Sequence, residues 1–295
     1  MERKLAVNGI ELNVETSGAH GDPAILLLHG AGQSLVAWED DFVAALVAGG
    51  RQVVRFDSRD AGRSTSYPAG EPGYGLNDLV ADAAALIEAL GLERAHLVAM
   101  SQGSAVAQLL ALGHPGRVAS LTLTGATPGG PGHEYADLPP MAEKILALFA
   151  EEQREPDWSD REAVLGYLVE GERPYAGAVF DEAAQRVMAG RVVDRTPNLA
   201  AQLTNPFLID AGTPWRGRLG EIATPVLVFQ GGDDPLFPPG HGQALAEAIS
   251  GARVRVLEGV GHEIFPRRTW DEVVPAILEH TARSARAQAS SAPSR

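Results

Sequence analysis

The sequence contains no cysteine among its 295 residues. This excludes disulfides, thiolate metal sites and a cysteine nucleophile. Basic residues are in short supply: 24 Lys and Arg stand against 38 Asp and Glu, which gives a formal net charge of −14. Because an acidic field repels phosphate backbones, we expect no nucleic-acid partner.

Long hydrophobic runs are also missing. The longest run suited to a buried strand is Ala24–Leu28, far short of the roughly 18 apolar residues that a membrane span needs. The first nine residues turn polar before the apolar region of a signal peptide could develop. We therefore expect a soluble, cytoplasmic protein with no membrane partner. Its length is sufficient to bury a full enzyme core.

Strand and helix patterns alternate along most of the chain. Residues 5–16 alternate apolar and polar around Asn8-Gly9, which predicts a β-hairpin. Later strands are predicted at residues 24–28, 52–56, 95–100, 118–124, 225–230 and 254–257, mostly separated by helical patterns. The alternation predicts an α/β fold with a mostly parallel sheet and helices on both faces.

The alternation is interrupted after the strand at 118–124. From Thr127 to about Gly220 the patterns are helical, with no convincing strand. We interpret this stretch as a helical cap inserted into one core domain. The predicted division is a core over residues 1–127, a cap over 128–220, the rest of the core over 221–283, and a disordered Ala- and Ser-rich tail over 284–295.

Ser101 is the candidate nucleophile. It follows the strand at 95–100 directly and precedes a helix, and the residues two before and two after it, Ala99 and Gly103, are small. A serine on such a sharp strand–turn–helix connection has its hydroxyl lifted out at the top of the sheet. The alternative is an ordinary N-cap serine. Ser250 lies between small residues too, but it ends a predicted helix, which is the wrong context.

An oxyanion site needs two N–H donors aimed at the developing negative charge. The backbone N–H of Gln102 is one, at the start of the helix after Ser101. We assign the second to Ala31, in the glycine-rich turn at residues 29–32 that follows the first buried strand. The alternative is a simple glycine turn. His29 is expected to hold this turn by hydrogen bonds. The neighbouring loop is expected to supply substrate-binding side chains, Gln33 and Trp38.

A serine nucleophile requires a base, and the base requires an orienting carboxylate. Asp233 and Asp234 follow the strand at 225–230, and His262 follows the strand at 254–257. Both places lie at the sheet edge that carries Ser101. We choose Asp234 over Asp233 because it directly precedes Pro235-Leu236. The alternative for both is ordinary loop chemistry.

At these residues the chain resembles the α/β-hydrolase superfamily over nearly its whole length. The stretches that carry the resemblance are residues 29–32, 57–64, 99–103, 234–235 and 259–262. Ala99 departs from the usual glycine. Within the superfamily the chain looks most like the aclacinomycin methylesterase branch, through residues 59–65, 74–76 and 79–83. That branch hydrolyses a methyl ester on an anthracycline polyketide.

The resemblance implies a two-step acyl transfer to and from Ser101 on a small-molecule ester. His262 would act as base and Asp234 would orient it, with no metal or organic cofactor. A lactonase, a C–C bond hydrolase or a cofactor-free perhydrolase would use the same three residues, and a hormone-type receptor would keep them without turnover. Asp57 and Arg59 could form a structural pair below the site; the alternative is a packing role for their loop.

Overall fold

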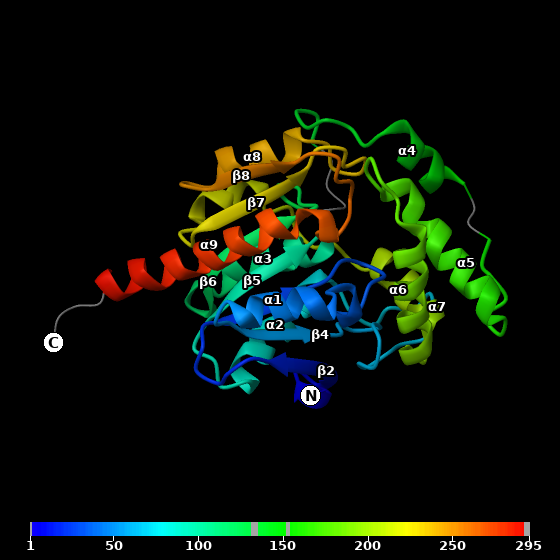
Figure 1. The fold of residues 1–295 in the computed structure, drawn as a ribbon, viewed down its shortest axis with the longest axis horizontal. Coiled ribbons are helices and arrows are strands. Elements are labelled where there is room, and N and C mark those ends of the chain that lie inside the picture. The colour runs from blue at the N-terminus through cyan, green and yellow to red at the C-terminus, as the bar shows by residue number, and fades with distance from the viewer. Residues whose placement is uncertain (1, 131–134, 152–153, 292–295) are drawn as a thin grey trace.

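A computed structural model describes residues 2–130, 135–151 and 154–291. Its centre is an eight-stranded sheet of order β1-β2-β4-β3-β5-β6-β7-β8 (Figure 1). Only the pairings of β1 with β2 and of β2 with β4 are antiparallel. The strands are β1 Glu2–Val7, β2 Ile10–Ser17, β3 Ala24–Leu28, β4 Gln52–Phe56, β5 Ala95–Met100, β6 Val118–Thr124, β7 Val226–Gly231 and β8 Arg253–Leu257.

The two faces of the sheet bury different residues of the same strands. Alternate side chains of β3 show this, because Leu26 belongs to an apolar cluster that includes residues of α2, α3 and α8, whereas Leu27 belongs to one that includes residues of α1 and α9. A strand covered on both faces reads as a continuous apolar run, which is why the central strands were predictable. These helices are α1 Asp40–Ala48, α2 Leu76–Ala89, α3 Gln102–Gly113, α8 Gly240–Ala248 and α9 Trp270–Ser291.

The predicted cap, residues 128–220, lies between β6 and β7, and the structure describes residues 128–130, 135–151 and 154–220 of it. Its α-helices gather at one end of the sheet (Figure 1). The pair α5 and α6 packs through its own small apolar cluster, centred on Leu165, Val169 and Ala189. The cap α-helices are α4 Glu143–Ala150, α5 Arg161–Glu172, α6 Glu182–Arg195 and α7 Leu199–Thr204.

Helix α9 continues to Ser291, where a disordered tail was expected from residue 284; its last turns are rich in Ala, which favours helix. Residues 292–295 lie outside the described residues. Helix α2 begins at Leu76, and Asp78 accepts a hydrogen bond from the Gly75 N–H at 2.8 Å. Over the described ranges, none of the helices has the length and apolarity to cross a membrane.

Candidate active site

Ser101 lies on a sharp turn between β5 and α3. Its backbone has φ 52° and ψ −117°, a conformation that side chains rarely adopt and that marks functional sites. The turn is held from both sides, because the Ser101 N–H donates to Thr124 O at 3.1 Å and the Ser104 hydroxyl donates to Ala99 O at 2.9 Å. The strained turn leaves the Ser101 side chain at the sheet edge, partly exposed.

Three predicted residues from distant parts of the chain meet there. His262 Nε2 lies 3.0 Å from Ser101 Oγ, and His262 Nδ1 lies 2.9 Å from Asp234 Oδ2. The other oxygen of Asp234 accepts hydrogen bonds from the N–H groups of Leu236 and Phe237, at 2.9 and 2.8 Å. These bonds fix the carboxylate, which in turn fixes the imidazole. Asp233, the rejected candidate, is exposed.

The glycine-rich turn after β3 passes beside the serine. A Cβ added at Gly30 would lie 3.2 Å from Ser101 Cβ, which is a crowded contact, so glycine at this position eases the close approach of the loop to the serine. Within the described chain the backbone N–H groups of Ala31 and Gln102 have no protein partner. Both are therefore available to an oxygen bound at Ser101.

His29 supports this turn from below. Its Nδ1 lies 2.8 Å from Gly30 O, and its Nε2 accepts from the Ser58 N–H at 3.2 Å. Because the first contact requires a protonated Nδ1 and the second a bare Nε2, the ring is the neutral Nδ1–H tautomer. Burial lowers the pKa of His29, which favours the same neutral form. The hydrogen bond from His29 to Gly30 O is the kind of contact by which this residue was expected to hold the turn.

The two substrate-binding candidates have different surroundings. Gln33 is part of the turn, and its Oε1 accepts the Gly30 N–H at 3.0 Å. Trp38 is fully buried and stacks on Phe42, with Phe265 beside it. The expectation that Trp38 lines a pocket is therefore wrong: the 3-10 helix at Leu35–Ala37 turns its ring into the core between α1 and α9.

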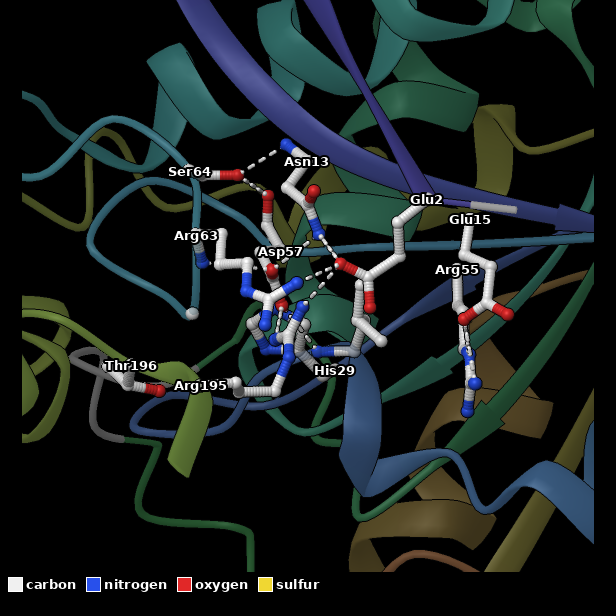
Figure 2. Close-up of polar contacts among 12 residues, drawn as sticks. Glu2, Asn13, Glu15, His29, Arg55, Asp57, Arg63, Ser64, Arg195 and Thr196 are labelled. Atoms are coloured by element: carbon white, nitrogen blue, oxygen red, sulfur yellow. Dashed lines mark hydrogen bonds and ion pairs between the residues drawn. The ribbon is translucent and has the colours of Figure 1, made fainter. Parts of the chain in front are cut away.

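Asp57 and Arg59 do not pair with each other. Arg59 forms a two-bond ion pair with Asp82 of α2. Asp57 is fully buried and accepts from Arg195 Nη1 at 2.8 Å. Figure 2 shows Asp57 at the centre of a cluster that joins the N-terminal strands, the loop after β4 and the cap helix α6. Its other donors are the N–H groups of Leu35 and Arg63 and the side chain of Asn13.

Cap residues that sequence reasoning missed also reach the site. The His262 N–H donates to Tyr175 O at 2.8 Å, and the two rings lie 6.2 Å apart. Glu172, three residues before Tyr175, is the last residue of α5, and solvent reaches its side chain. Partial desolvation by the surrounding protein atoms raises the pKa of its carboxyl, whereas the nearby His262 lowers that pKa. No short motif marks either residue.

The residues that the structure describes offer no cluster of metal ligands. They contain no group of three or more His, Asp or Glu side chains arranged to hold a metal ion. The residues around Ser101 present a hydroxyl, an imidazole, a carboxylate and two backbone N–H groups without a protein partner, which are the kinds of group that acyl transfer requires.

The fold and this constellation define a class of protein. Residues 23–268 match the family described as alpha/beta hydrolase fold, and the chain belongs to that family. It is 30% identical to the rhodomycin D methylesterase DauP of Streptomyces sp. (strain C5), covering 95% of this chain and 97% of that protein. It is 33% identical to the rhodomycin D methylesterase DnrP of Streptomyces peucetius, covering 88% and 92%.

A solved structure resembles the chain over nearly the same length. The 2-hydroxy-6-oxo-6-phenylhexa-2,4-dienoate hydrolase of Rhodococcus sp. strain RHA1 superimposes with a TM-score of 0.74 at 23% identity, covering 96% of this chain and 98% of that one. This likeness confirms the predicted fold. The two methylesterases confirm the resemblance to the methylesterase branch.

Proposed function

We propose that this protein is a serine hydrolase that cleaves a carboxylic ester through an acyl-enzyme on Ser101. The observation that carries the proposal is the continuous chain of contacts from Ser101 Oγ to His262 and on to Asp234, at 3.0 and 2.9 Å. The unpartnered N–H groups of Ala31 and Gln102 beside it supply the expected oxyanion hole.

The mechanism follows from these positions. His262 Nε2 takes the proton as Ser101 Oγ attacks the ester carbonyl, and Asp234 holds Nδ1–H toward itself and stabilises the imidazolium. The negative carbonyl oxygen is bound by the N–H groups of Ala31 and Gln102. His262 then protonates the leaving alcohol. In the second half it activates a water that releases the acid.

We further propose a methyl ester of a polyketide-like small molecule as substrate, and residues 128–220 as the cap that selects it. The similarity to two rhodomycin D methylesterases over most of the chain supports the ester class. The placement of the cap supports its role, because its residue Tyr175 contacts His262 and loops at this sheet edge carry function.

The test is steady-state hydrolysis of a panel of methyl esters, p-nitrophenyl esters, lactones and β-diketones by the wild-type protein and Ser101→Ala. We expect many turnovers per active site on methyl esters and a loss on the order of 10⁶ in kcat for the variant. Circular dichroism controls for folding. A folded Ser101→Ala variant with wild-type turnover would rule out the nucleophile, and a burst that stops after one turnover would favour a receptor.

A further inference from the structure

One cap segment contacts both halves of the expected oxyanion hole. It comprises α7 and the 3-10 turn Asn205–Phe207 that follows. Gln202 of α7 donates through Nε2 to Gly32 O at 3.0 Å, next to Ala31. Pro206 O accepts from Gln102 Nε2 at 2.8 Å, on the residue that carries the other donor.

Gln202 is oriented by further bonds. Its side chain is buried, with 1% exposed. Its Oε1 accepts from the Gly62 N–H at 2.9 Å and faces the Thr196 hydroxyl at 3.2 Å. Because an N–H can only donate, the Gly62 bond identifies this atom as the oxygen. Nε2 is therefore the atom left to donate to Gly32 O.

The Ala31 N–H needs such a restraint. Glycines flank it on both sides, and Gly32 has a φ of 73°, so the backbone of the turn is not rigid by itself. It is held by hydrogen bonds, among them those that His29 Nδ1 and the Gln33 N–H donate to Gly30 O, at 2.8 and 3.3 Å. Gln33 fixes the near side, by accepting from the Gly30 N–H. Gln202 fixes the far side, at Gly32 O. Together the two glutamines hold the backbone before and after Ala31.

We propose that Gln202 is a positioning residue that aims the Ala31 N–H at the substrate oxygen, so that the cap completes the oxyanion hole as well as covering it. The inference rests on the proposed ester hydrolysis. An oxyanion donor acts mainly in the transition state, and losing one lowers kcat by about 10²–10³. A misaligned donor should therefore lower kcat by part of that factor, with little change in the binding of the substrate in its ground state.

The test compares Gln202→Met, which keeps the length and bulk of the side chain without its hydrogen bonds, with Gln202→Ala. For both we expect kcat to fall about tenfold to a hundredfold, with KM changed much less. The affinity for a trifluoromethyl ketone, which forms an oxyanion on Ser101, should fall by the same factor as kcat. Thermal melting reports on folding.

Asn205→Ala is the matched control. Asn205 is a buried amide in the same segment, and it holds Asp60, Pro68 O and the Gly70 N–H, away from the oxyanion turn. It should leave the ketone affinity near that of the wild type. If Asn205→Ala lowers kcat and ketone affinity as much as Gln202→Met, the effect is general anchoring of the cap and the proposal is overturned. Unchanged kcat and affinity in Gln202→Met would also overturn it.

Reaction of Ser101 with a fluorophosphonate, followed by intact mass, separates this inference from the function on which it rests. The phosphonyl oxygen uses the same hole, so Gln202→Met should be labelled more slowly than the wild type. A wild-type protein inert toward both esters and the fluorophosphonate would overturn the proposed function, and this inference with it. A reactive wild type with equally fast labelling of Gln202→Met overturns only the role of Gln202.

Discussion

The guanidinium of Arg195, in the last turn of α6, donates to the buried carboxylate of Asp57 at 2.8 Å. The same carboxylate oxygen accepts the Leu35 N–H at 2.9 Å. Leu35 lies just beyond the oxyanion turn, so the ion pair ties the cap to the loop that carries Ala31. Both side chains are largely removed from water, with 7% and 0% exposed.

Removing one member of this pair should be costly. Arg195→Ala leaves the Asp57 charge buried with only neutral donors, and we expect the free energy of unfolding to fall by about 3 kcal/mol. Asp194→Ala is the control, since Asp194 is the preceding residue and forms an exposed ion pair with Arg161. Its loss should change stability by less than about 1 kcal/mol. Equal effects in urea denaturation would contradict the argument.

Backbone strain at Ser101 predicts a difference between two inactive variants. Both Ser101→Gly and Ser101→Ala lack the hydroxyl, but only alanine keeps a Cβ at φ 52°, ψ −117°. Glycine adopts this conformation without steric cost. We expect Ser101→Gly to be more stable than Ser101→Ala by about 1 kcal/mol. Thermal or urea unfolding measures the difference, and a more stable alanine variant would show that the turn is unstrained.

Acidification should destabilise the protein below pH 6.5. Burial, with help from Arg51, His280 and Arg94, lowers the pKa of His96 to about 4, and burial also lowers the pKa values of His29 and His241. Between pH 6.5 and 4 these histidines therefore bind more protons in the unfolded chain than in the folded one. The stability present above pH 6.5 is lost as the pH falls through this window, by about 3 kcal/mol for His96.

The variant His96→Asn isolates this contribution, because asparagine can keep the contact with Ser120 Oγ, at 2.8 Å from His96 Nδ1, without titrating. Urea midpoints measured from pH 7 to 4 should fall less steeply than in the wild type. The control is His20→Asn, which removes an exposed histidine. An equally flattened profile in both variants would mean that His96 is not the source of the slope.

The central strands and the three residues around Ser101 were predictable because each carries a local signal. Strand β3 is a continuous apolar run, and Ser101, Asp234 and His262 each follow a strand in a small-residue context. Trp38 shows where such reasoning stops. An aromatic residue beside a glycine turn fits a pocket or a core equally well, and only its packing on Phe42 and Phe265 decides between them.

Contacts between cap and core could not be predicted for a related reason. Arg195 meets Asp57 across 138 positions, and Gln202 meets Gly32 across 170. Neither pair has a fixed spacing or a motif, and polar side chains in a helical segment are usually solvated. A pairing of Asp57 with Arg59 was expected because both lie in the loop after β4. In the structure the two side chains face different neighbours: Asp57 pairs with Arg195 of α6, and Arg59 pairs with Asp82 of α2.

Gly103 lies two residues after Ser101 and packs closely against the backbone at the end of β3. A Cβ there would lie 2.6 Å from Leu28 O and 2.7 Å from His29 O, which are backbone atoms at the start of the oxyanion turn and cannot easily move. Gly103→Ala should therefore push α3 away from β3. We expect a loss of about 3 kcal/mol in stability and a lower kcat, because the shift separates the N–H groups of Gln102 and Ala31.

Gly113→Ala, at the open end of the same helix, should instead be neutral or stabilise by up to about 1 kcal/mol. Urea unfolding and ester hydrolysis of both variants test this. A Gly103→Ala protein as stable and active as Gly113→Ala would show that the turn tolerates a side chain, and that glycine at this position is not required by close approach.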